Sequence, residues 1–316
     1  MNWLIVAISA YFILAVVFLV DKYLLVRAIP DPRIYVFYVG ALGILVLILA
    51  PFVGFYVPGK TEIILGLLAG AVFIYGLFWF YKTLQIFEPS RVVPAIGGLT
   101  PLFTFGLVYL SASDGEVLSF KALMAFVLLV LGSVLVNFKK EKLTNLKGLK
   151  FSALTAFLFS LSFVLIKYVY LVQPFWNGFI WRSIGGFLMA FCFFIFFPEI
   201  RREIFKKFVP RPLFKSGSGA RKERPSKRTA VIFLSNQTVA AGATILQNWA
   251  IALVPLVYVP LVNALQGSQY AFLFILAVAL SIKFPGALKE EISRETILQK
   301  IIAITLICGG LALLAI

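Results

Sequence analysis

Amides and hydroxyls are the side chains in this sequence that could do chemistry, and they interrupt long apolar runs. Gln237, Thr244 and Asn248 are spaced at i, i+7 and i+11 around the small Ala241, which places them on one face of a helix. Polar side chains at bilayer depth are costly and usually face a cavity or another helix. This row therefore predicts either a face that binds a polar solute or one that hydrogen-bonds to a neighbouring helix.

Three other apolar segments carry comparable rows of polar, aromatic or small residues. They are Asn263, Gln266 and Tyr270; Gly97, Thr100 and Thr104; and Tyr75, Trp79 and Lys82. Pro94 and Pro101 flank the second of these rows, and a proline within a helix frees a backbone carbonyl. We expect the four segments to line one central cavity, with bonding between helices as the alternative.

Charged residues within apolar runs form a second group of candidates. Arg182 follows Trp181, and a buried guanidinium needs a partner. It could bind a carboxylate or phosphate with two hydrogen bonds, or it could bond carbonyls at helix ends. Lys22 and Lys167 occupy similar places in two runs, and we expect both to extend to the membrane surface. Asp21 is expected at the cytoplasmic edge, beside a neighbouring cation.

The sequence lacks the residues that several common kinds of catalytic and metal site use. The chain has no histidine, and its two cysteines, Cys192 and Cys308, lie in separate apolar runs. None of the 13 acidic residues is expected in the middle of an apolar run. We therefore predict no catalytic residues, no metal site and no cofactor, and expect a protein that is not an enzyme. No phosphate-binding glycine loop is present, which argues against ATP-driven pumping by this chain.

The composition indicates the environment of these residues. Of 316 residues, 61% are hydrophobic and 13% are charged, whereas soluble domains are about half apolar and a quarter charged. A soluble fold of this composition would expose large apolar patches. We therefore predict an all-α polytopic membrane protein, because backbone groups inside a bilayer must be satisfied within each segment.

A bilayer core about 30 Å thick takes roughly 20 helical residues to cross. The sequence predicts ten transmembrane helices, at 3–20, 33–55, 61–84, 89–111, 117–138, 148–171, 174–198, 230–253, 256–282 and 296–315. Pro255 leaves almost no loop between the eighth and ninth spans. Gly66 and Gly70 form a GxxxG pattern, which is typical of close helix packing.

Lys and Arg residues concentrate in the odd-numbered connections between these spans. The exceptions are Lys60, Lys121, Lys167 and Arg182. Since cytoplasmic loops carry the Lys and Arg excess, the odd-numbered loops are predicted to be cytoplasmic and both termini to lie outside. The net charge of +16 then follows mainly from this topology. The basic 199–229 connection reads as a flexible cytoplasmic loop; an anionic-lipid or nucleic-acid patch is the alternative.

The two halves of the chain resemble each other in the order of their segments. Phe18–Leu25 at the end of the first span matches Val164–Tyr170 at the end of the sixth, and Ser90–Pro101 matches Leu256–Gly267. The sequence predicts two five-helix repeats, 1–138 and 148–316, joined by a basic cytoplasmic linker at 139–147. Five is an odd number, so the second repeat must be inverted. Inverted repeats are typical of transporters, whose substrate lies between the halves.

These segments resemble a known family. Phe87–Thr104 with Gly115–Ser119, and Asn248–Gln266 with Lys289–Ser293, are similar to segments of the drug/metabolite transporter superfamily, specifically its ten-helix EamA-type permeases. The resemblance covers nearly the whole chain apart from the 199–229 connection. It implies a central cavity lined by the third, fourth, eighth and ninth spans. Many such permeases have cytoplasmic termini, so the charge distribution here departs from that pattern.

The leading hypothesis is a secondary transporter in the plasma or inner membrane that moves a small organic metabolite by alternating access. The solute is expected to be an amino acid or another zwitterionic or anionic molecule, because no mid-membrane carboxylate is predicted for cation exchange. The alternatives are a lipid-linked carrier or flippase component, an integral membrane enzyme using interfacial residues such as Asp114 and Glu116, and a scaffold. The expected partners are the solute and the lipid bilayer, with no nucleic acid, in a monomer or homodimer.

Overall fold

The computed structural model describes residues 2–27, 31–86, 89–111, 118–137, 146–208, 227–283 and 294–315. Within these ranges the chain forms helices and turns, with no strand. The helices are α1 (Asn2–Arg27), α2 (Pro32–Gly43), η1 (Ile44–Phe52), α3 (Lys60–Ile86), α4 (Pro89–Ser111), α5 (Phe120–Asn137), α6 (Leu146–Val172), α7 (Phe175–Phe196), α8 (Pro198–Phe208), α9 (Lys227–Leu253), η2 (Leu256–Tyr258), α10 (Val259–Ala264), α11 (Gln266–Lys283) and α12 (Arg294–Ala315).

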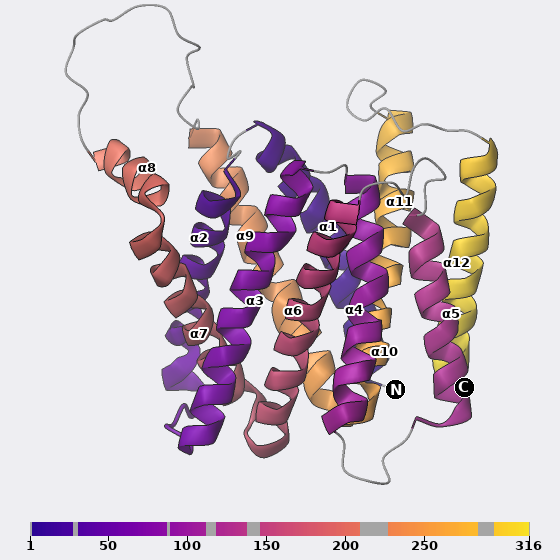
Figure 1. Ribbon diagram of the computed structural model, residues 1–316, viewed down its shortest axis with the longest axis horizontal. Coiled ribbons are helices and arrows are strands. Elements are labelled where there is room, and N and C mark those ends of the chain that lie inside the picture. Colours follow the sequence, from indigo (N-terminus) through magenta and orange to yellow (C-terminus); the bar gives the residue numbers. More distant parts are fainter. Residues whose placement is uncertain are drawn as a thin grey trace, which may run out of the picture.

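The long helices lie side by side in one bundle, and successive ones run in opposite directions (Figure 1). Both termini lie at the end of the bundle away from α8. Pairs distant in sequence make the main contacts: α1 packs on α9, α3 on α6 and α7, α4 on α6, and α5 on α12. The largest apolar core lies where these pairs meet and includes Tyr11, Leu129, Ile166 and Leu261.

Within the described residues, five helical segments are long and apolar enough to cross a membrane. They are Asn2–Asp21, Pro32–Phe52, Lys60–Leu84, Gly148–Val172 and Phe175–Phe196, and shorter apolar helices cover Ala95–Ser111, Phe120–Leu135 and Ile301–Leu314. Large apolar side chains such as Ile5, Leu110 and Phe196 are exposed on the outside of the bundle. Exposed apolar surface on this scale fits contact with lipid. The prediction of an all-helical chain with several helices that could span a membrane is confirmed.

Two of the ten predicted spans are broken rather than continuous helices. The second changes from α2 to the 3₁₀ helix η1 at Ile44, with Pro51 inside η1. The ninth is divided into η2, α10 and α11, with a turn at Leu265. Pro255 precedes η2, and Pro260 stands near the start of α10, where a missing backbone N–H is tolerated. The turn places Asn263 on α10 and Gln266 on α11.

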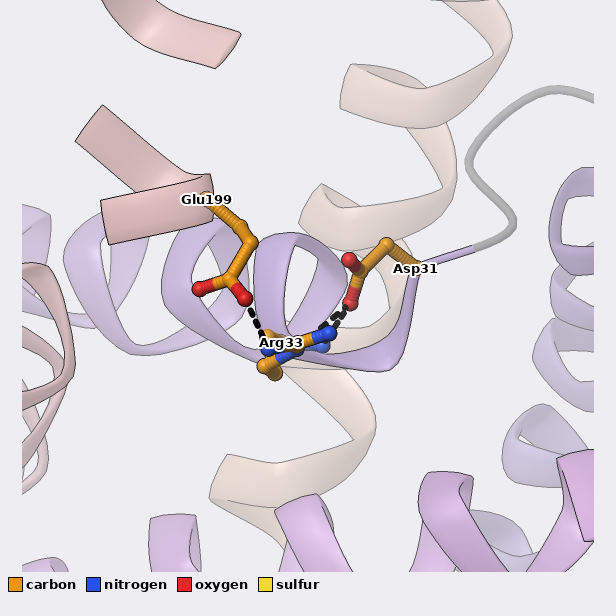
Figure 2. A network of polar contacts seen from close by, with 3 residues as sticks. All are labelled: Asp31, Arg33 and Glu199. Atoms are coloured by element: carbon orange, nitrogen blue, oxygen red, sulfur yellow. Dashed lines mark hydrogen bonds and ion pairs between the residues drawn. The ribbon is translucent and has the colours of Figure 1, made fainter. Parts of the chain in front are cut away.

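The 199–229 connection begins as a helix rather than as the expected flexible loop. Residues 198–208 form α8, which packs on α7 and α2, while 209–226 and most of the predicted 139–147 linker lie outside the described residues. Arg33 on α2 pairs with Glu199 at 2.7 Å and with Asp31 at 3.3 Å (Figure 2). The backbone N–H of Glu199, and then Arg33, hold the pKa of Glu199 below its usual range. This exposed pair orients α8 and adds little stability.

Glycines let α3 and α7 approach each other closely. A Cβ at Gly66 would meet the Cβ of Trp181, and one at Gly70 would meet the carbonyl oxygen of Arg182. On the other side, a Cβ at Gly185 would meet the carbonyl oxygen of Leu67. The close packing predicted from the GxxxG pattern is therefore confirmed, and it fixes the position of Arg182 relative to α3.

Replacing Gly70 with leucine should force α3 and α7 apart. Overpacking of this kind costs about 1–3 kcal/mol or more, so we expect a lower melting temperature in detergent. Gly106→Leu is the matched control, since a Cβ at Gly106 meets no other atom within 4 Å. Equal melting temperatures for both variants would contradict the close contact.

Candidate functional site

A cavity of about 470 Å³ lies between α2 with η1, α3, α7 and α9. Most of its lining is apolar or glycine. Its polar lining residues are Arg182, Ser183, Gln237, Thr238 and Thr244. A largely apolar cavity of this size with a few convergent polar groups is the usual form of a small-molecule site.

Of the described residues that line the cavity, Arg182 on α7 alone carries a charge. The residue is 5% exposed, and its Nε and Nη2 atoms have no hydrogen-bond partner among the residues that the structure describes. Its guanidinium lies 4.3 Å from the ring centre of Phe73 and 6.0 Å from that of Phe179. Within the described part of the chain, no carboxylate pairs with it. Among the described residues, the site therefore holds a buried cation with no counter-ion.

Thr238 and Thr244 on α9, and Ser183 on α7, supply hydroxyl groups to the cavity. The hydroxyls of Thr244, Thr238 and Ser183 donate to carbonyl oxygens one turn earlier in their own helices, at 2.8, 3.0 and 2.9 Å. Their protons are thus engaged, and each hydroxyl oxygen keeps the capacity to accept a hydrogen bond.

A polar network joins α1, α2 and α9 near the α8 end of the cavity. Asp21 Oδ1 accepts hydrogen bonds from the Tyr35 hydroxyl at 2.5 Å and from Asn236 Nδ2 at 2.7 Å. Gln237 Nε2 donates to the Tyr35 hydroxyl at 3.2 Å, which links the network to a lining residue. The fully buried Tyr35 ring also contacts Phe233 edge-on. The network ties α9 to α2 at this end.

This network was not predicted from the sequence. Asp21 was expected at the cytoplasmic edge beside a cation, but α1 continues past it to Arg27. The described partners of Asp21 are the neutral side chains of Tyr35 and Asn236. The side chain of Lys22 lies outside the described residues. The adjacent amides Asn236 and Gln237 were the available signal, since two neighbouring amides in an apolar helix must face different partners.

Three of the predicted binding residues, Arg182, Gln237 and Thr244, line this cavity. The others lie elsewhere: Tyr75, Trp79, Lys82, Gly97, Thr100, Thr104, Trp181, Asn248, Asn263, Gln266 and Tyr270. This cavity lies beside α2 and α7, and no residue of α4 or α10 is among its described lining.

The predicted row on α4 packs directly against α10 and α11. Asn263 Nδ2 donates to Thr104 Oγ1 at 2.9 Å, and the Thr104 hydroxyl donates to the carbonyl of Thr100 at 2.8 Å. A Cβ at Gly97 would meet the ring of Tyr270. In this conformation these side chains contact each other, and Asn263 and Thr104 form a hydrogen bond between helices, which was the alternative to a cavity lining.

Asn248 is also engaged within the protein. It is fully buried, donates to the carbonyl of Thr244 at 2.8 Å and accepts from the Tyr170 hydroxyl at 3.3 Å. Beside it, Gln247 Nε2 donates to the Tyr11 hydroxyl at 3.4 Å, and this hydroxyl donates to the carbonyl of Val262 at 2.9 Å. The sequence did not single out Gln247 as a bonding residue.

The predicted aromatic residues are not among the described lining residues, and Trp79 and Trp181 lie beside opposite ends of α3. Lys82 Nζ lies 4.6 Å from the ring centre of Trp79, which stacks on Phe151. At the other end, Trp181 Nε1 donates to the carbonyl of Tyr56 at 3.4 Å. The stacking of Trp79 on Phe151 thus joins α3 to α6, and the Trp181 hydrogen bond joins α7 to the segment before α3.

Lys167 is buried, rather than extended to the membrane surface as expected. It is 2% exposed, and its Nζ donates to the carbonyls of Ala252 at 3.1 Å and Val254 at 2.5 Å. These carbonyls lie at the C-terminal end of α9, where the helix dipole favours a cation. Lys167 therefore fixes the end of α9 that lies away from the Asp21 network.

Comparison with known proteins supports the architecture. No protein-family model matches the chain, and no curated protein matches its sequence. Among solved structures, one described only as a crystal structure of a protein has a TM-score of 0.62 and 16% sequence identity. The match covers 99% of this chain and 94% of that chain. A likeness at this identity shows a shared fold: an all-helical chain with several helices that could cross a membrane.

Removing the Tyr35 hydroxyl should weaken the Asp21 network. In Tyr35→Phe, Asp21 loses its shorter hydrogen bond and Gln237 loses its acceptor, so we expect a loss of about 1–3 kcal/mol and a lower melting temperature. Tyr109→Phe on the exposed face of α4 serves as the control. An unchanged melting temperature for Tyr35→Phe would show that the network is not structural.

Proposed function

We propose that the protein is a secondary transporter that moves a small organic solute by alternating access. In this proposal, the chain crosses the membrane ten times as two inverted five-helix halves, 1–138 and 148–316, in the manner of the drug/metabolite transporters that its segments resemble. The observation that carries the proposal is an asymmetry: α3 and α7 are packed closely, whereas the corresponding helices, α9 and α2, are separated by the cavity.

The helix contacts support an inverted repeat. With the helices of the first half matched to those of the second, α1 on α9 corresponds to α6 on α3, and α4 on α6 corresponds to α11 on α1. The matched helices α5 and α12 pack on each other. Figure 1 also shows α1 and α6 running in opposite directions, as inversion requires.

The difference between the α3–α7 and α9–α2 pairs suggests what the second conformation of the transporter would be. In an inverted-repeat transporter, the two halves exchange conformations to open the site to the other side. That exchange would close α9 on α2 and separate α3 from α7. Gly43 and Ala241, on the α2 and α9 walls, are small residues suited to such closure, like the glycines now buried between α3 and α7.

A cysteine pair can test this closure directly. We expect Gly43→Cys and Ala241→Cys, in a Cys192→Ser/Cys308→Ser background, to form a disulfide in reconstituted vesicles treated with copper phenanthroline. A disulfide needs Cα atoms within about 7 Å, so the bond reports a closed α2–α9 gap. Gly43→Cys with Gly106→Cys is the control pair, because Gly106 lies on α4 outside the cavity. The absence of cross-linking in the first pair would contradict the proposed motion.

The charge distribution supports a cytoplasmic α8 end in a plasma or inner membrane. Arg33, Arg201 and Arg202 belong to elements at that end, while Lys60 begins α3 at the opposite end. By the positive-inside rule, both termini would lie outside.

Reporter fusions measure this orientation. We expect alkaline phosphatase fused to the C-terminal end of the chain to be active in bacterial cells, and green fluorescent protein at the same place to be dark. The same reporters fused after Phe208, in α8, should give the reverse pattern. A fluorescent C-terminal fusion would overturn the proposed topology.

A further inference from the structure

We propose that the cavity binds an amphipathic organic anion, with its acidic group at Arg182 and its apolar part directed toward the surrounding lipid between α2 and α9. This inference rests on the proposed transport function and names the chemical class of its substrate. Two independent features carry it: the unpaired guanidinium in the cavity and the apolar side of the cavity at the outer surface.

The first feature is the charge. A buried cation without a counter-ion is strongly unfavourable, and buried charges are normally paired. Arg182 has two ring contacts but no carboxylate partner in the described ranges, and its Nε and Nη2 atoms bond to nothing. The described acid next to the cavity, Asp21, is bound to Tyr35 and Asn236. An external anion would therefore complete the site.

The shape of a guanidinium limits which acidic groups the ligand could carry. Its parallel N–H donors match the two oxygens of a carboxylate or phosphate, and such bidentate pairs are among the strongest hydrogen bonds. Ser183 follows Arg182 along the lining, and Gln237 and Thr244 supply polar atoms from α9. These groups would bond other polar atoms of the ligand headgroup.

The second feature is the opening. Three apolar lining residues are also exposed on the outside of the bundle: Leu45 at 55%, Ile48 at 65% and Leu234 at 53%. The apolar lining is thus continuous with the surface that would meet acyl chains. A hydrophilic solute would gain nothing from this side, whereas an apolar tail would stay out of water along its whole path.

Binding of matched twelve-carbon probes tests both halves of the proposal. Full-length protein would be placed in phosphatidylcholine nanodiscs, and binding of radiolabelled laurate measured by equilibrium dialysis. We expect saturable laurate binding, with dodecanol, dodecyltrimethylammonium and acetate each competing at least tenfold more weakly. Equal competition by dodecanol would remove the role of the charge, and equal competition by acetate would remove that of the tail.

Variants locate the binding to this cavity. Arg182→Met should weaken laurate binding at least tenfold and melt at or above the temperature of the native protein without ligand, because it removes an unpaired buried charge. Arg202→Met, an exposed arginine on α8, should bind normally. A side chain has open space at both Gly43 and Gly106, so we expect both phenylalanine variants to fold. Gly43→Phe should block binding because it fills the cavity, whereas Gly106→Phe on α4 should not. Unchanged binding in Arg182→Met or Gly43→Phe would overturn the assignment.

The Gly43–Ala241 cross-link separates this inference from the proposed function. If the cross-link forms but laurate does not bind, the transport motion stands and the amphipathic anion is wrong. If the cross-link does not form and laurate binds at Arg182, the site stands and alternating access is wrong.

Discussion

The electrostatics of one arginine constrain the site more than any other interaction. Arg182 is held against Phe73 because glycines bring α3 and α7 close together, and this packing excludes both water and carboxylates from most of its guanidinium. A protein selected for stability alone would place an apolar residue there, because an unpaired buried charge is costly. In our proposal, a bound anion completes the site, and the unliganded protein is less stable because of the buried charge.

The polar contacts around the cavity divide into those that hold the bundle and those that remain available. At one end, Asp21, Tyr35 and Asn236 join α1, α2 and α9, and at the other, Lys167 bonds the last carbonyls of α9. Helix α9 is thus fixed at both ends while its middle borders the cavity. In our proposal, these end contacts are the hinges about which the α2–α9 gap closes.

Much of the local structure could be predicted from the sequence, because an apolar segment in lipid must satisfy its own backbone and so becomes a helix. The close contact at Gly66 and Gly70 was predictable for a similar reason, since residues without large side chains let backbones approach. The breaks at Ile44 and Leu265 were not predicted. Prolines near a helix start are compatible with either a continuous or an interrupted span, so the tertiary packing decides between them.

The sequence by itself determined that the chain is helical, that several helices are apolar enough to cross a membrane, and which polar side chains lie within them, because hydropathy and helical spacing are local properties. Only the tertiary structure decided which of those side chains bind each other and which line a cavity. Asn263 and Gln237 are both amides in apolar helices, yet the first bonds Thr104 away from the cavity, whereas the second bonds Tyr35 and also lines the cavity. That difference depends on how distant helices pack, and helix spacing within one segment carries no information about it.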